Sequence, residues 1–411
     1  MNAPLPPAGP RAPLAGLTRG LARVTGSSLG RYQTAVVRIG ISFTWLFFLL
    51  REWPNRHEMY GPESPWSWEM ARRLTADNHA FTALIWSDSN LWFETVYAFS
   101  IVSSLLLMLG WRTRTMAVLS MIGVLSLQNR SVFLGDGGDN VIHLMALYTV
   151  LTRCGLVWSL DARRAARRGG EPGRDLTGIV LWALCGAALV LAQSAGQPRP
   201  AWTADGPLPG IGWATVLWGL WFVQGLWWLV CRYASGEPRT VLDVFAHLLH
   251  NAALLVIMVE VCLIYATAGW YKIQGSRWQD GTALYYPLHL DYFSPWPELS
   301  HALAANGLVV LLLTYGTVAV QVAFPFTLLN RRVKNVLLAV MMIEHLGIAL
   351  VLGLPFFSLA MIVADAVFLP TGFLRRLGSL VGRTREKVLP ARREAVPAQR
   401  EGEADTRTLV G

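Results

Sequence analysis

The sequence predicts an all-α fold: a polytopic helical membrane protein with about ten transmembrane helices and both termini in the cytoplasm. Of its 411 residues, 53% are hydrophobic and 15% are charged, whereas soluble proteins carry about 25% charged residues. Apolar runs of about 18 to 25 residues recur along the chain, and about 20 residues span a bilayer as a helix. The 18 tryptophans fit this class, since tryptophan concentrates at membrane interfaces.

The expected helices follow one another with mostly short connections. The first contains Arg38 and is not followed by a signal-peptide cleavage site, so we expect it to be retained. The seventh is the longest and ends in an aromatic segment around Lys272. Pro355 suits the first position of the tenth helix. The ten expected spans are 32–50, 91–109, 116–133, 140–157, 176–194, 211–230, 241–271, 306–329, 335–352 and 355–369.

Two kinds of longer segment lie outside these spans. Residues 1–30 and the Arg-rich residues 371–411 lack apolar runs, so we expect them to be disordered cytoplasmic ends of a transmembrane domain over 31–370. Residues 51–90 are rich in tryptophan and proline, which favours an ordered interfacial loop.

The net charge of +9 is explained by membrane orientation rather than by nucleic-acid binding. With the N-terminus in the cytoplasm, nearly every basic loop falls on the cytoplasmic side, as the positive-inside rule requires. We therefore expect a multi-pass protein of the plasma membrane that contacts the lipid bilayer and binds no nucleic acid. The basic segments on that side are Arg112/Arg114, 163–174, Arg232/Arg239, Arg331/Arg332/Lys334 and the C-terminal tail.

The sequence does not predict a metal site. The four cysteines lie in or beside apolar runs without CxxC spacing, so they are interpreted as packing residues. Asp243, His247 and His250 recur at i, i+4 and i+7 and could form a metal half-site. Because the predicted topology places them at the cytoplasmic end, a polar stripe against another helix is the favoured interpretation.

Lys272 is the main candidate for chemistry. It lies between aromatic residues near the outer end of the seventh helix. If the amine points inward, loss of hydration favours its neutral form, which could act as a general base. The alternative is a lysine whose stem lies along apolar surface while its amine reaches the interface.

Two further groups of polar residues have both structural and functional interpretations. The glycine-rich segment 135–140 could turn the chain and cap a helix, or Asp139, Asn140 and His143 could form one face of a site. Glu260 lies deep in the seventh helix, where a carboxylate is a functional candidate. Its expected partner is Arg38, His345 or Lys272. Glu344, His345 and Asp365 could pair structurally or form a proton path, as in a transporter.

Several motifs in a fixed order resemble the HTTM family, the bacterial relatives of the membrane domain of vitamin K-dependent gamma-carboxylase. The resemblance covers roughly residues 32–370. The motifs are Leu109 to Arg114 (LGWRTR), Gly135 to Asn140 (GDGGDN), Trp158 to Asp161 (WSLD), Ala268 to Lys272 (AGWYK) with Trp278, Gly281 and Ala283, and His345 followed by Leu354 to Ser358 (LPFFS).

The resemblance implies a carboxylase-like lyase or a quinol-dependent oxidoreductase. In the carboxylase, a lysine deprotonates reduced vitamin K, which reacts with oxygen to give a strong base; that base takes a proton from a glutamate side chain, and carbon dioxide adds. Lys272 matches this lysine and His143 matches an active-site histidine. The implied cofactor is a reduced vitamin K or menaquinone-type quinone. Its expected contacts are Asp139, Asn140, Trp270, Trp278 and Glu260.

The chain also departs from the family pattern. Residues 162–240 look like an inserted helical hairpin, Gln321 stands where many relatives are expected to have glutamate, and no large luminal domain follows the last helix. The departures weigh against carboxylation of protein glutamates and leave a small-molecule or lipid reaction open. The alternative hypothesis is a non-enzymatic transporter or a partner-binding scaffold, for which no protein partner can be named.

Overall fold

The structure is a computed structural model that describes residues 12–131, 133–168, 175–197, 212–234 and 236–388. Within these ranges the regular structure is all helical and contains no strand, which confirms the all-α part of the predicted fold class. The chain divides into a main unit, Met1–Thr371, and a second unit, Gly372–Gly411. Everything described below lies in the main unit unless it is stated otherwise.

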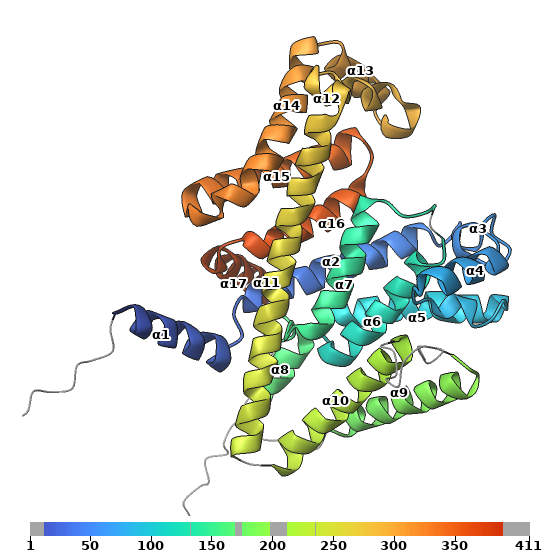
Figure 1. The fold of residues 1–411 in the computed structure, drawn as a ribbon, viewed down its shortest axis with the longest axis vertical. Helices are drawn as coiled ribbons and strands as arrows, with labels where there is room; N and C mark the ends of the chain where they lie inside the picture. Colours follow the sequence, from blue (N-terminus) through green and yellow to red (C-terminus); the bar gives the residue numbers. More distant parts are fainter. Residues whose placement is uncertain (1–11, 132, 169–174, 198–211, 235, 389–411) are drawn as a thin grey trace, which may run out of the picture. The chain divides into compact units, whose positions relative to one another are not determined.

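Five helices form a core bundle, in which α2 packs against α5, α7 and α16, and α6 packs against α5 and α7 (Figure 1). Its interior is a continuous apolar cluster that includes Trp45, Leu125 and Met145. Glycines allow the closest approaches: a Cβ on Gly40 would lie 2.2 Å from the Val363 side chain. The five helices are α2 (Arg31–Arg51), α5 (Asn90–Leu109), α6 (Thr113–Gln128), α7 (Gly137–Leu151) and α16 (Pro355–Asp365).

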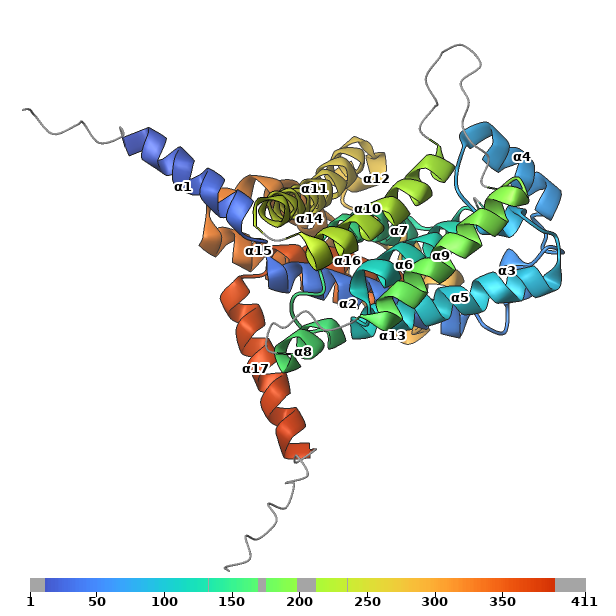
Figure 2. The ribbon, with the colours of Figure 1, turned by 90° about the horizontal axis from the view of Figure 1, so that it is seen from below.

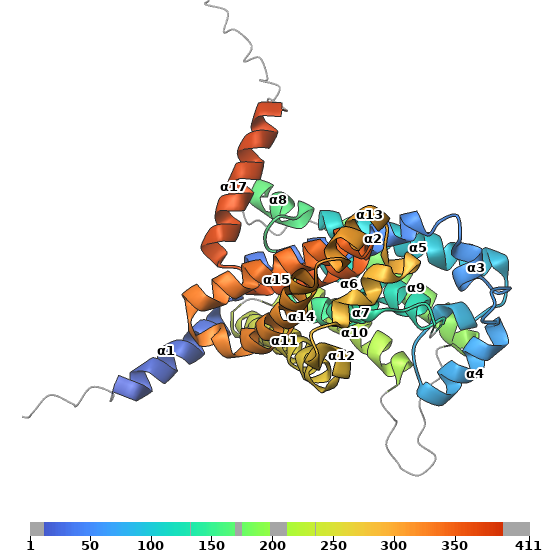
Figure 3. The same cartoon turned by 90° about the horizontal axis from the view of Figure 1, so that it is seen from above.

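A second bundle is built around the longest helix, α11 (Glu237–Gln274) (Figure 3). It packs against α14 (Gly307–Ala323) and reaches the core bundle through α7, while α15 (Arg331–Val351) packs against both α14 and α16. Asparagine side chains cap α14 and α15 at their first turns. Pro355 occupies the first position of α16, as the sequence predicts.

Short elements connect these helices. Residues 52–89 contain α3 (Arg56–Tyr60), α4 (Trp68–Asn78) and η1 (Ala83–Ile85), so the predicted ordered loop has regular structure. A run of short helices follows α11 and packs at its Lys272 end and on α14. These are α12 (Ser276–Gln279), η2 (Ala283–Tyr285), η3 (Pro287–His289), η4 (Asp291–Phe293) and α13 (Pro297–Ala304), while η5 (Phe324–Leu329) follows α14 and η6 (Ala366–Phe368) follows α16.

The predicted inserted hairpin consists of α9 (Leu176–Ser194) and α10 (Trp213–Tyr233), which lie side by side (Figure 2). Its two helices are locked by Trp182 and Trp221, whose rings stack with centroids 4.1 Å apart. Each indole N–H donates to the other residue's carbonyl, at 3.0 and 2.9 Å. The surfaces that face away from this contact are largely exposed and apolar, as expected for helices surrounded by lipid.

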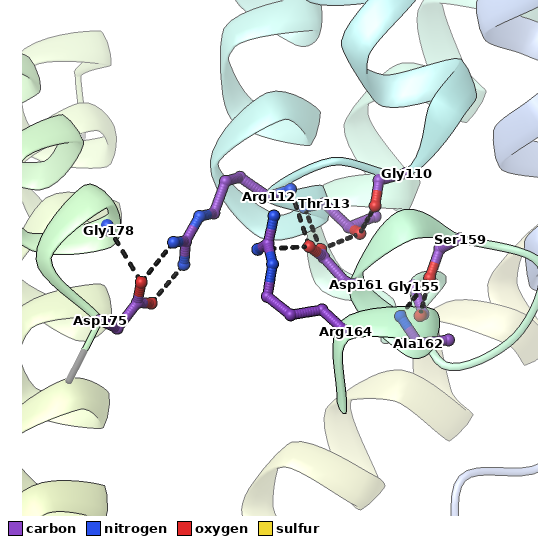
Figure 4. Close-up of polar contacts among 10 residues, drawn as sticks. All are labelled: Gly110, Arg112, Thr113, Gly155, Ser159, Asp161, Ala162, Arg164, Asp175 and Gly178. Atoms are coloured by element: carbon purple, nitrogen blue, oxygen red, sulfur yellow. Dashed lines mark hydrogen bonds and ion pairs between the residues drawn. The ribbon is translucent and has the colours of Figure 1, made fainter. Parts of the chain in front are cut away.

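The hairpin is fastened to the core bundle by charges at its base (Figure 4). Arg112 makes a bidentate ion pair with Asp175, which also caps α9. Asp161, in α8 (Leu160–Arg167), accepts hydrogen bonds from the backbone N–H groups of Arg112 and Thr113. The motif residues around 110 and 160 therefore hold the start of α6, the end of α5 and the base of the hairpin together.

Among the described residues, seven helices are long and apolar enough to cross a membrane, or eight if Pro355–Phe368 and Thr371–Arg383 count together as one span. The seven correspond to seven of the ten predicted spans. The other three predicted spans form helices α6, α7 and α16, of 16, 15 and 11 residues. A 16-residue helix is about 24 Å long and a bilayer core about 30 Å thick, and these three helices are packed inside the core bundle, where other helices replace lipid.

Both ends of the chain contain helices where the sequence analysis expected disorder. Residues Ala12–Gly26 form α1, which packs on α11, and residues Thr371–Val388 form α17, most of which belongs to the second unit. Leucines spaced three or four residues apart give each segment an amphipathic helical pattern. The expectation of disorder was based on the low content of apolar residues, and composition alone does not take their spacing into account. Residues 1–11 and 389–411 lie outside the described residues.

Candidate functional site

Lys272 points into the second bundle rather than away from it. Its Nζ donates a hydrogen bond to Oε1 of Gln321 on α14, at 2.5 Å. The same Nζ lies 5.3 Å from the ring centroid of Trp278 on α12. The lysine side chain is partly buried. Of its two predicted orientations, the inward one is therefore observed, with the aromatic ring beside the amine.

Gln321 links Lys272 to a carboxylate. The glutamine is buried, and its Nε2 donates to Oε1 of Glu344 on α15, at 2.7 Å. Its amide thus accepts from the amine on one side and donates to the carboxylate on the other. Where the family resemblance predicts glutamate, this chain places a neutral amide between the Lys272 amine and the Glu344 carboxyl group, both of which are partly buried. Whenever Lys272 is protonated and Glu344 is ionised, their opposite charges compensate each other across this amide.

A second buried polar group lies two helical turns from Lys272 along α11. Tyr265 is seven residues before Lys272, so both side chains leave the same face of the helix. Its hydroxyl donates to Oδ2 of Asp365 at 3.0 Å and lies 3.0 Å from Nε2 of His345. Tyr265, His345 and Asp365 are 1%, 2% and 0% exposed. Residues from α11, α15 and α16 therefore meet in one enclosed cluster, which we call the tyrosine triad.

The structure does not bring His143 to Lys272. His143 Nδ1 lies 3.2 Å from Oε1 of Gln128, and Gln128 donates in turn to the carbonyl of Asp139. The Asp139 side chain accepts from the backbone N–H of Asp136, which completes a capping box at the start of α7. The helix-capping interpretation of the glycine-rich segment is therefore observed.

The other predicted cofactor contacts are dispersed. Asn140 is exposed and the Trp270 ring is 62% exposed on the outside of α11. Glu260 is partly buried within α11, but none of its three expected partners bonds to it. Lys272 bonds to Gln321, and His345 to Tyr265. Arg38 donates to the carbonyls of Leu107, Met108 and Trp158 at 2.7 to 2.9 Å.

The histidines near the start of α11 are part of an interhelical polar contact. His247 Nδ1 lies 2.9 Å from the Ser28 hydroxyl, and His250 accepts from the backbone N–H of Arg153 at 2.8 Å. Arg153 also pairs with Asp243, at 3.6 Å. Within the described ranges no group of three or more metal-binding side chains is present. This arrangement agrees with the predicted polar stripe.

Sequence reasoning missed the role of Tyr265. The signal was its spacing of seven residues from Lys272, which places both on one helix face. Tyrosine drew no attention because an aromatic residue in an apolar helix is normally a packing residue. His345 and Asp365 were singled out as intramembrane polar groups, but the sequence did not show that a tyrosine joins them.

Known proteins give no further guidance to this site. Comparison with protein-family models, with curated proteins and with solved structures finds no match to the chain.

Proposed function

We propose that the chain is a multi-pass protein of the plasma membrane with about ten crossings and both termini in the cytoplasm. Seven candidate spans support a multi-pass protein, and the distribution of basic loops supports the orientation. In it, the three short helices α6, α7 and α16 complete the crossings inside the core bundle. The Lys272 end of α11 then lies near the outer face of the membrane.

Within that topology, we propose an enzyme of the carboxylase-like class that uses Lys272 as a general base toward a quinol-type lipid. The observation that carries the proposal is the inward-pointing amine, bonded to Gln321 and adjacent to Trp278. An aromatic face beside an amine fits a flat hydroxylated ring, since aromatic rings stack on one another and the amine can face the hydroxyl. A reduced quinone, when bound, would supply an acidic hydroxyl and two reducing electrons.

The residues of the chain have distinct parts in this chemistry. A neutral Lys272 donates one N–H to Gln321 and keeps its lone pair for an incoming proton. After protonation, the ammonium is stabilised through Gln321 by the carboxylate of Glu344. Trp278 orients the ring and shields the amine from water. Gln321 and Glu344 are therefore positioning residues, and Lys272 is the catalytic residue.

The alternative is a non-enzymatic transporter or scaffold. The observation that favours transport is the presence of two carboxylates, Glu344 and Asp365, inside helices of the second and core bundles. Ionisable groups at such positions mark proton and substrate paths in transporters. A transporter would move its substrate across a liposome membrane and would not oxidise a quinol.

The test is binding and turnover of a reduced menaquinone analogue by the purified full chain in detergent. Lys272→Met keeps the length of the side chain and removes the amine, and Tyr271→Ala, at a 74% exposed neighbour, is the matched control. We expect saturable binding to wild type and control, and turnover lowered about 100-fold or more in Lys272→Met, the usual contribution of a general base. Absence of saturable binding to the wild type would reject the quinol proposal.

A further inference from the structure

The tyrosine triad is a line of three hydrogen-bonding groups whose two outer atoms have no partner. The hydroxyl of Tyr265 is in the middle, between Nε2 of His345 and Oδ2 of Asp365. At the two ends, His345 Nδ1 and Asp365 Oδ1 are buried and make no hydrogen bond to the described residues. An unpaired buried polar atom costs about 1–3 kcal/mol, so two of them at opposite ends of one line call for an explanation.

The bond directions define how a proton could move along this line. Tyr265 has one hydroxyl proton, which it donates to Asp365. Nε2 of His345 must then be the donor to the tyrosine oxygen, because that oxygen has no second proton to give. In this state, Asp365 is the acceptor end of the line and His345 is the donor end.

We propose that Asp365, Tyr265 and His345 form a proton relay inside the membrane domain. Water first adds a proton to Nδ1 of His345, which gives an imidazolium. Its Nε2–H bond then breaks and a new O–H bond forms on Tyr265, while the original tyrosine O–H bond breaks and an O–H bond forms on the carboxylate oxygen Oδ2 of Asp365. Tyrosine is unchanged, one proton has moved from the imidazolium to the carboxylate, which leaves both groups neutral, and no electrons are exchanged. The unpaired Nδ1 and Oδ1 are the points at which water delivers and removes protons.

The relay also continues a polar series that begins at Lys272. Glu344 precedes His345 on α15 and interacts electrostatically with both Asp365 and Tyr265. Beyond Asp365, Lys334 Nζ donates to the carbonyl of Phe368 at 2.5 Å, near the other end of the second bundle. Polar groups therefore extend along much of the bundle. The relay could therefore carry away the proton that Lys272 takes up. That role rests on the proposed function, whereas the relay itself does not.

The surroundings of the triad limit which groups can alter its titration. On α11 the ionisable neighbours are Lys272 and Cys262, which interact electrostatically with His345 and Asp365 respectively. On α15 the neighbour is Glu344. Two neutral rings also pack on the triad: the ring of Phe324 lies 6.0 Å from the ring of Tyr265, and that of Phe357 lies 5.8 Å from the ring of His345. Coupled titration of His345 and Asp365 is therefore the expected signature.

The experiment is pH-difference infrared spectroscopy of the purified full chain in lipid nanodiscs. Asp365→Asn identifies the carboxyl band of Asp365, and His345→Gln identifies the imidazole band while keeping an N–H donor near the Nε2 position. Tyr265→Phe removes only the connecting hydroxyl. We expect the two bands to titrate together in the wild type. In Tyr265→Phe, the midpoint of the Asp365 band should move by about one pH unit or more, and its exchange in D2O should slow at least tenfold.

The proposal is overturned if Tyr265→Phe leaves both the midpoint and the exchange of the Asp365 band unchanged. It is also overturned if the wild type shows no titrating carboxyl band that Asp365→Asn removes. Should Tyr265→Phe fail to fold, the wild type compared with Asp365→Asn still decides, because the Asp365 proton of a relay open to water exchanges readily in D2O and that of an isolated structural bond does not. Lys272→Met separates the two proposals: the triad titration should persist in it even if no quinol turnover is found in the wild type.

Discussion

Substitution of Asp161 tests how the start of α6 is held in place. Its carboxylate accepts from the backbone N–H of Arg112 at 3.0 Å, and from the backbone N–H and the hydroxyl of Thr113 at 2.7 and 2.6 Å. Arg112 precedes α6 in a left-handed conformation, φ 48°, and its own side chain does not cap the helix. A residue from α8 therefore performs the capping that α6 lacks locally.

The expected loss in Asp161→Ala follows from what would remain unpaired. The Thr113 hydroxyl retains a bond to the Gly110 carbonyl at 3.3 Å, and Arg112 is only partly buried, so water can reach its N–H. The buried N–H of Thr113 loses its acceptor, and a buried donor without an acceptor costs about 1–3 kcal/mol of stability. Loss of an anion at a helix N-terminus adds about 0.3–1 kcal/mol. We therefore expect Asp161→Ala to lower the free energy of unfolding by about 1–4 kcal/mol.

The assay is reversible unfolding in mixed micelles, followed by tryptophan fluorescence, for Asp161→Ala, Asp161→Asn and Arg164→Ala. Asp161→Asn keeps one acceptor oxygen and should lose about half as much. Arg164 lies 3.4 Å from the same carboxylate in a partly exposed ion pair, which is worth about 0–1 kcal/mol. A loss in Asp161→Ala no larger than that in Arg164→Ala would refute the capping argument.

Two further predictions concern the hairpin and the core bundle. The hydrogen bonds that Arg112 donates to Asp175 hold the pKa of this carboxyl group below its ordinary value of 3.8. The ion pair therefore stabilises the fold above about pH 4, and this stabilisation is lost as the pH falls through the lowered pKa. Asp175→Asn should therefore lower stability by about 1 kcal/mol at pH 7, and its melting temperature should approach that of the wild type as the pH falls below the ordinary carboxyl pKa of 3.8; a constant difference contradicts this. Gly40→Ala places a methyl group against Val363 and should cost about 1–3 kcal/mol, whereas Gly219→Ala, with open space around it, should be neutral or stabilising in the same thermal assay.

The sequence predicted the helices well because their signals are local. Runs of apolar residues located every helix of the core and second bundles, and Pro355 and the aspartates near 136–139 marked helix starts correctly. It predicted the lengths of the buried helices less well. Interior helices such as α6 are apolar for the same reason as lipid-facing ones, so hydropathy does not distinguish a helix surrounded by protein from one surrounded by lipid.

The candidate site was predicted only in part because its contacts are not local. Lys272 and Trp278 are close in sequence, and the structure places them together. Gln321 and Glu344 come from two other helices, and the sequence does not give the rotation of those helices about their axes. His143 and Asp139 share a helix face as expected. However, His143 bonds to Gln128, and Asp139 is part of the capping box of its own helix.

The position of α16 determines when the main unit can close during synthesis. Proteins are made from the N-terminus, so α2 and α7 are complete long before α16, which packs against both. Until then, the surfaces around Gly40 and Gly138 that receive Val363 and Phe357 have nothing to cover them. A nascent chain stopped before Pro355 would lack the helix that covers these surfaces, and the triad would lack its acid. The core bundle, whose first helices are made early, is thus completed only when α16 has been synthesised.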